Sequence, residues 1–138
     1  MSFLLALFLV VHASIHIGYI CGPAWPFVAG DPWVVTLCGA NPDAIRTIGI
    51  ALVLLSFAGY LGASVAAMGF ARSLWAPTAV IASVASAMVL ILFPTVWTLP
   101  GLAIDVELLF ATLGWGWRPT PFFGRARHAS SARRAAAR

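Results

Sequence analysis

Four long apolar stretches account for most of this 138-residue chain and limit what it can fold into. They run over about residues 3–20, 44–71, 76–93 and 100–117, and a helix that crosses a bilayer needs about 20 mostly apolar residues. The chain is only 9% charged, whereas a soluble domain carries about 25% charged residues. The sequence therefore predicts an all-α integral membrane protein, a four-helix bundle formed by residues 1–118.

The charged residues divide between the ends of these stretches, which predicts the orientation of the bundle. The acidic residues lie near one set of ends: Asp31, Asp43, Asp105 and Glu107. All arginines but Arg46 lie near the other set: Arg72, Arg118, Arg125, Arg127, Arg133, Arg134 and Arg138. Because Arg and Lys are concentrated on the cytoplasmic side of membrane proteins, we expect both termini to be cytoplasmic. The expected location is the cytoplasmic (inner) membrane of a bacterium, as a multi-pass protein.

The segments outside the apolar stretches are interpreted from their composition. Residues 21–41 are rich in proline, glycine and tryptophan, and we expect an ordered outer loop at the membrane interface rather than a helix. Residues 119–138 form a basic cytoplasmic tail, expected to be disordered, whose arginines suit anionic lipid headgroups. No zinc-finger spacing, phosphate loop or aromatic–basic repeat supports nucleic acid as a partner.

Local patterns predict where the helices begin and how they pack. A signal peptide cleaved after Val11-His12-Ala13 is the alternative to a first helix, but the residues before the apolar stretch include no Lys or Arg, so we favour a retained helix. Asn41-Pro42-Asp43 is typical of a capped helix start. Small residues four apart, such as Ala58 and Gly62, predict close helix packing, although alanine is abundant throughout the chain.

The only two cysteines, Cys21 and Cys38, lie on the side predicted to be oxidising. We expect a structural disulfide between them, which in the loop-entropy model contributes about 3 kcal/mol to the free energy of unfolding. Two free cysteines at the membrane boundary are one alternative. A redox-active pair is the other, although the chain has no Cys-x-x-Cys spacing to tune a thiolate.

Five ionisable residues are predicted to lie in the outer half of the bundle: His12, His16, Arg46, Asp105 and Glu107. His12 and His16 are four residues apart and share one helix face. From the helical rise of about 1.5 Å per residue, three helices present these residues at a similar depth. A charged side chain at the bilayer centre costs about 2.5–3.5 kcal/mol, so we expect the group to pair inside the bundle.

Asp105 and Glu107 cannot share a partner, because two helical residues this far apart point about 200° from each other. We expect Asp105 to face Arg46 or His16, and Glu107 to be a second inward group or to contact another subunit. Three interpretations stay open: a structural Arg46–Asp105 bridge, a ligand- or proton-handling cavity, and a metal site of His12, His16 and Asp105. The metal site is disfavoured because the two histidines supply only two ligands.

Two further motifs carry a family resemblance. His16-Ile17-Gly18-Tyr19 is followed by a Pro- and Trp-rich loop, and Phe93-Pro94 precedes a Gly101-Leu102 opening of the last helix. With the length, the four spans and the early His-x3-His, these motifs resemble the small bacterial four-helix membrane proteins grouped as DoxX-like, over residues 8–113. The resemblance implies the fold and no catalytic residue. Members of that group often carry an uncharged polar residue at the position of Asp105.

The sequence has no recognisable nucleophile–base pair, cofactor loop or complete metal set, which favours a non-enzymatic membrane component. Such a protein would bind a lipid-like or apolar ligand, or act as an accessory subunit of a membrane complex. One alternative is a proton-coupled small-solute transporter that acts as a dimer. A metal- or quinone-dependent membrane redox enzyme is the second. The expected partners are membrane lipid and a homo-oligomer or larger complex, and no cofactor is assigned.

Overall fold

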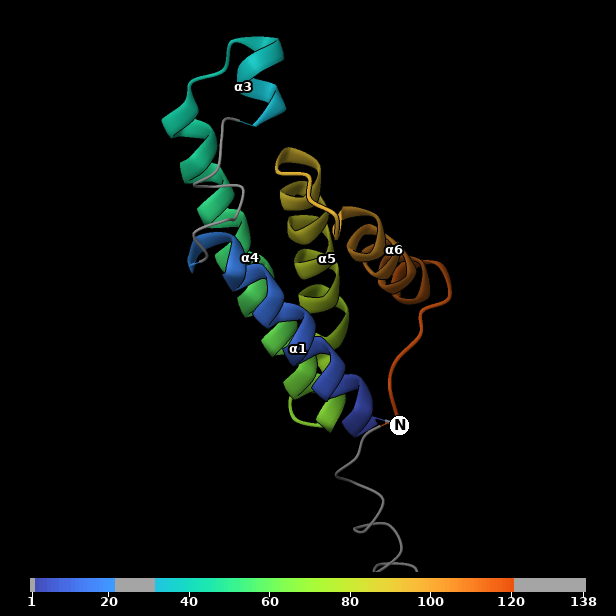
Figure 1. The fold of residues 1–138 in the computed structure, drawn as a ribbon. Coiled ribbons are helices and arrows are strands. Elements are labelled where there is room, and N and C mark those ends of the chain that lie inside the picture. Colours follow the sequence, from blue (N-terminus) through green and yellow to red (C-terminus); the bar gives the residue numbers. More distant parts are fainter. Residues whose placement is uncertain (1, 22–31, 121–138) are drawn as a thin grey trace, which may run out of the picture.

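The structure, a computed structural model, describes residues 2–21 and 32–120, which are helical and contain no strand (Figure 1). Its helices, in chain order, are α1 (Ser2–Cys21), α3 (Trp33–Cys38), α4 (Pro42–Met68), the 3-10 turn η1 (Arg72–Leu74), α5 (Trp75–Leu92), α6 (Thr98–Leu109) and the π-helix η2 (Phe110–Gly114). Three segments are long and apolar enough to cross a membrane: α1, α4 and the continuous η1–α5. The all-helical class and the membrane-compatible helices predicted from the sequence are confirmed.

The boundaries of α4 follow from its terminal residues. The predicted cap forms, since the Asn41 side chain accepts a hydrogen bond of 3.0 Å from the Ala44 backbone N–H, with Pro42 in the first turn. The helix ends where Gly69 adopts a left-handed conformation with φ of 108°, which a residue with a side chain rarely adopts. With 27 residues, α4 is about 40 Å long and exceeds the hydrocarbon thickness of about 30 Å.

The long helices pack in sequence order, as a row rather than as a closed ring. Helix α1 packs against α4, α4 against α5, and α5 against α6, and Figure 1 shows α6 lying obliquely beside α5. The α4–α5 contact is close because Gly59 faces Ala82: a Cβ added at Gly59 would lie 2.8 Å from the Ala82 Cβ. The small residues found at this contact are those that let membrane helices approach each other.

The fourth predicted span differs from the expectation. Instead of one helix over 100–117, α6 has 12 residues and is followed by the five residues of η2. Twelve residues rise only about 18 Å, which is less than the bilayer core requires. Consequently α6 is not among the helices long enough to span alone.

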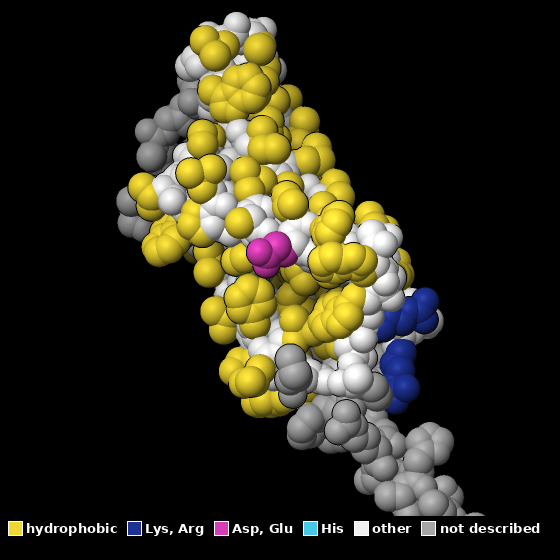
Figure 2. Space-filling model, turned by 90° about the vertical axis from the view of Figure 1, so that its right-hand side faces the viewer, with side chains coloured by type: hydrophobic (Ala, Val, Ile, Leu, Met, Phe, Trp, Pro, Cys, Tyr) yellow, Lys and Arg dark blue, Asp and Glu magenta, His cyan; other side chains and the backbone are white. Residues whose placement is uncertain are grey.

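Two contacts place the ends of the described chain together. The Ser2 hydroxyl contacts the Thr120 carbonyl, and the Trp75 indole donates to the Trp117 carbonyl at 3.1 Å. The turn at Arg72 and the residue Arg118 are therefore at the end of the molecule where α1 begins, which we call the Ser2 end. The opposite end, where α1 finishes, we call the Cys21 end. On the side where α6 lies, apolar side chains cover most of the surface and basic ones gather at its lower end (Figure 2).

The segment predicted as the outer loop contains structure that its composition did not indicate. Residues 33–38 form α3, contrary to the expectation of no helix. The Trp33 indole donates to the Ile91 carbonyl at 2.7 Å, which anchors α3 to the end of α5. Residues 22–31 of this loop and residues 121–138 of the predicted tail, with His128, lie outside the described part of the chain.

The expected disulfide does not form, since Cys21 and Cys38 are both free and exposed. Cys21 ends α1 beside the middle of α4, whereas Cys38 ends α3 beyond the start of α4 (Figure 1). The length of α4 beyond the other helices separates the two thiols. Of the interpretations open from the sequence, the structure has the free cysteines.

Candidate functional site

A fully buried carboxylate on α6 is the centre of a polar group inside the helices. Asp105 has no exposed surface. One carboxylate oxygen, Oδ1, accepts a hydrogen bond from the Tyr60 hydroxyl of α4. The other, Oδ2, accepts one from the Ser86 hydroxyl of α5 at 2.6 Å. Asp105 therefore joins three helices through its own side chain.

The two histidines of α1 complete this group. His16 Nε2 lies 2.6 Å from the Ser86 Oγ, and His12 Nε2 lies 3.6 Å from the Asp105 Oδ1. The two imidazole centroids are 5.1 Å apart. We call the following residues the polar cluster: His12, His16, Tyr60, Ser83, Ser86 and Asp105. The cluster draws on all four of the longer helices, and Ser83 belongs to it through a contact of 3.4 Å with the Tyr60 hydroxyl.

Helical spacing explains how residues so far apart in the chain meet. His12 and His16 share one face of α1 because they are four residues apart, and Ser83 and Ser86 share one face of α5 because they are three apart. His16, Ser86 and Asp105 lie five, six and seven residues from the Cys21 end of their helices. These separations correspond to depths of about 8–11 Å, so the three residues meet at one level.

The cluster is surrounded by apolar side chains, so its hydrogen bonds offset the cost of burying polar groups. Tyr60 is fully buried and belongs to the apolar core of α1, α4 and α5. An unpaired carboxylate at the centre of a bilayer costs about 2.5–3.5 kcal/mol. Two hydroxyl donors and a nearby imidazole offset that cost for Asp105.

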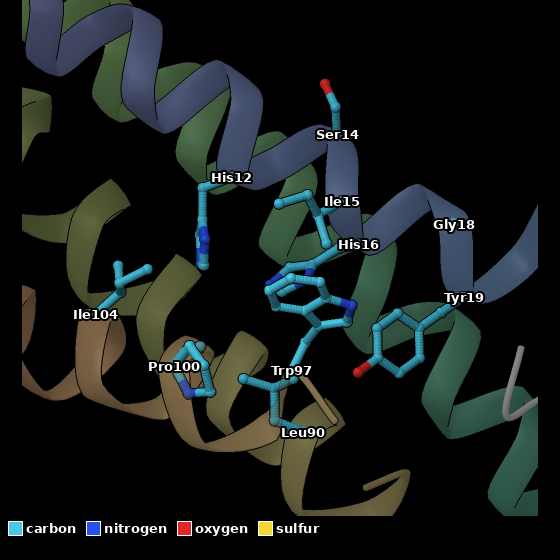
Figure 3. A pocket seen from close by; sticks show the side chains of 11 residues that line it. His12, Ser14, Ile15, His16, Gly18, Tyr19, Leu90, Trp97, Pro100 and Ile104 are labelled. Carbon is cyan, nitrogen blue, oxygen red and sulfur yellow. The ribbon is translucent and has the colours of Figure 1, made fainter. Parts of the chain in front are cut away.

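A cavity of about 490 Å³ lies between α1, the end of α5 and the start of α6 (Figure 3). Apolar groups supply most of its wall, including Leu90, Pro100 and Ile104. Both histidines of the polar cluster line it. Trp97, which also lines it, is 61% exposed, whereas His16 is 1% exposed. The cavity therefore leads from the side of the molecule to the polar cluster.

Two nitrogen atoms of the histidines that line the cavity lack hydrogen-bond partners. His16 Nδ1 and His12 Nε2 are buried and have no partner. The His12 nitrogen has the Asp105 carboxylate nearby, but no such group compensates the His16 nitrogen. Because buried polar atoms in proteins are nearly always hydrogen-bonded, this nitrogen is a candidate contact for a ligand.

Two predicted site residues lie elsewhere. Arg46 is half-buried near the start of α4, and the predicted Arg46–Asp105 bridge does not form. Arg46 precedes Tyr60 by 14 residues of continuous helix, which separates the two by about 21 Å along the axis. Glu107 is exposed on the outer face of α6, so it is not a second inward group, and its contact with another subunit stays a prediction.

The metal interpretation finds no geometric support in the described part of the chain. Within residues 2–21 and 32–120, no three His, Cys, Asp or Glu side chains are placed to hold a metal ion. His12, His16 and Asp105 do come together, but His16 directs Nε2 to Ser86 rather than to a shared centre with Asp105.

Tyr60 and Ser86 were missed from the sequence. The spacing of Ser83 and Ser86 on one face of an apolar helix was the available signal, since hydroxyls in lipid-embedded helices seek partners on neighbouring helices.

No family model, curated protein or solved structure matches this chain. The resemblance to DoxX-like proteins therefore stays a prediction.

Proposed function

We propose that this protein is a membrane component that binds a lipid-like, largely apolar ligand in the cavity beside the polar cluster. The supporting observation is the cavity itself: about 490 Å³ is within the range of about 300–1,000 Å³ typical of small-molecule sites. Its apolar wall ends at two buried histidines. A wall of this kind suits a hydrocarbon chain, and the histidines suit one polar group at its end.

The position of the cavity supports entry from the membrane. Ile15 and Trp97, both lining residues, are 45% and 61% exposed on helices whose surface is apolar. In a bilayer such a rim faces acyl chains rather than water. In our proposal the protein lies in a bacterial inner membrane with the Ser2 end cytoplasmic, so the ligand enters from the outer leaflet.

The other functions considered from the sequence stay predictions. An accessory role in a larger complex is compatible with ligand binding. The transporter and redox interpretations would both use the polar cluster without Arg46. The binding of anionic lipid by the basic tail concerns residues outside the described chain.

The proposed function is tested by native mass spectrometry of protein extracted in mild detergent, with analysis of the bound lipids. We expect a retained lipid adduct in the wild type. Ile104→Trp should reduce it, because the larger indole occupies part of the cavity that Ile104 lines. Val106→Trp is the matched control, since Val106 is on the same helix but 59% exposed on its outer face. A wild type without any adduct, or equal retention by both variants, would overturn the proposal.

A further inference from the structure

The hydrogen bonds behind the cavity determine which nitrogen of His16 carries a proton. The Ser86 hydroxyl donates to the Asp105 Oδ2, and a hydroxyl has only one proton to donate. Its contact with His16 Nε2 at 2.6 Å must then be donated by the imidazole. A neutral His16 therefore carries its proton on Nε2, and Nδ1 holds the lone pair.

This assignment determines whether His16 donates or accepts a hydrogen bond on the side of the cavity. Nδ1 is the nitrogen of His16 that is buried without a partner, and with the proton on Nε2 it can only accept. His16 is one of the residues that line the cavity. A ligand that fills the cavity can satisfy this acceptor only by presenting a donor.

We propose that the cavity selects apolar molecules that carry a hydroxyl group near one end, and that this hydroxyl donates to His16 Nδ1. The inference rests on the proposed function and narrows the ligand to one chemical class. The hydroxyl can come from a phenol- or quinol-type ring or from an aliphatic alcohol. Molecules of the same shape that can only accept, such as ethers and quinones, leave the buried nitrogen unsatisfied and bind less tightly.

Ser86 acts in this proposal as a positioning residue. It does not line the cavity. It affects the ligand only because its oxygen accepts a hydrogen bond from the His16 Nε2–H while its hydroxyl donates to Asp105. Without that hydroxyl the imidazole can place its proton on either nitrogen. The preference for a donor should then disappear, while the apolar contacts of the ligand remain.

Two matched pairs of probes test the selectivity: 4-dodecylphenol against its methyl ether, and dodecanol against its methyl ether. Binding is measured to the full chain in nanodiscs of one lipid composition. For each pair, the ratio of the affinity of the hydroxyl compound to that of its ether is compared between the wild type and its variants. Partitioning of the probes into the bilayer is the same for every variant and cancels in this comparison. We expect the hydroxyl compound to bind about fivefold to tenfold more tightly, the size expected for one buried hydrogen bond. A preference in the phenol pair alone assigns a ring-bearing ligand, and one in the alcohol pair alone assigns an aliphatic ligand. A preference in both assigns the hydroxyl itself.

Two serine variants separate the positioning role from a loss of structure. Ser86→Ala should reduce the ratio to about one while both members of a pair still bind. Ser64→Ala is the control, because Ser64 is a buried serine outside the polar cluster that donates to the Ala6 carbonyl and does not contact His16. Its ratio should equal that of the wild type. Equal ratios in the wild type and Ser86→Ala would overturn the proposal.

A measurement without ligand tests the same point directly. In protein labelled with ¹⁵N histidine, the ring resonances of His16, identified by their loss in His16→Gln, should show a protonated Nε2 and an unprotonated Nδ1. Protonation on Nδ1 would overturn the inference and leave the proposed function standing. If the native protein holds no lipid and no probe binds, the proposed function fails with it.

Discussion

At the scale of single residues, the ionisable members of the polar cluster could be predicted from the sequence, whereas the tyrosine could not. His12, His16 and Asp105 could be predicted to meet, because ionisable groups in apolar helices seek partners away from lipid. Arg46 was placed wrongly because depth was counted from the start of α4, and that helix extends beyond its neighbours. Tyr60 could not be predicted, since a lone tyrosine in a helix carries no sign of its partner.

Asp105→Ala should destabilise the protein, because the hydroxyls of Tyr60 and Ser86 lose their shared acceptor. We expect the free energy of unfolding to fall by about 1–3 kcal/mol, given the modest value of hydrogen bonds between membrane helices. Thermal unfolding in detergent micelles measures this effect. Glu107→Ala is the control, since it removes an exposed carboxylate from the same helix and should leave the melting temperature nearly unchanged. Equal melting temperatures for the two variants would show that the buried contacts contribute nothing.

At the scale of elements, hydrophobic length predicted three helices to within a few residues, and the cap at Asn41 fixed one boundary. It did not predict how α6 ends, because the apolar stretch continues to Trp117 while the helix changes to the π-helix η2 at Phe110.

Small-residue spacing identified the close contact of α4 and α5 only in part. Of the predicted pair, Gly62 lies at the contact, since a Cβ added there would be 3.0 Å from the Thr78 Cγ2 of α5. Ala58 is exposed, and its neighbour Gly59 is buried against Ala82 instead.

Gly59→Val should therefore weaken the α4–α5 contact. A side chain at this position meets the Ala82 backbone, with the first added carbon 3.1 Å from the Ala82 Cα, and backbone cannot move aside as a flexible side chain can. Overpacking of this kind costs about 1–3 kcal/mol, to be measured as loss of thermal stability in micelles. Ala58→Val adds similar bulk on the exposed face of the same helix, and it should melt like the wild type. The close contact would be refuted if Gly59→Val were as stable as Ala58→Val.

At the scale of the whole molecule, the two ends of the helical row meet mainly through the polar cluster. Helices α1 and α6 are joined by the approach of His12 to Asp105, while their packing partners are α4 and α5. The cavity lies where α1 and α6 diverge toward the Cys21 end. The gap between α1 and α6 therefore gives room for a ligand at the level of the polar cluster.

The orientation of the molecule can be tested with cysteine labelling, since its two ends differ in charge. The contacts of Ser2 with Thr120 and of Trp75 with Trp117 place the chain start, Arg72 and Arg118 at one end. In our proposal α6 with η2 returns the chain across the membrane. We expect the Ser2 end to be cytoplasmic, because arginine is concentrated on that side of membrane proteins.

Two single-cysteine proteins measure it in spheroplasts of a bacterial host. The first keeps the exposed Cys38 in a Cys21→Ser background, and the second carries Arg118→Cys with both native cysteines changed to Ser. A membrane-impermeant maleimide should label Cys38 in intact spheroplasts, and should label position 118 only after the membrane is permeabilised. Labelling of both positions in intact spheroplasts would mean that α6 does not cross and that the chain crosses the membrane an odd number of times. Labelling of position 118 alone would reverse the orientation, and would place the opening of the cavity toward the cytoplasmic leaflet.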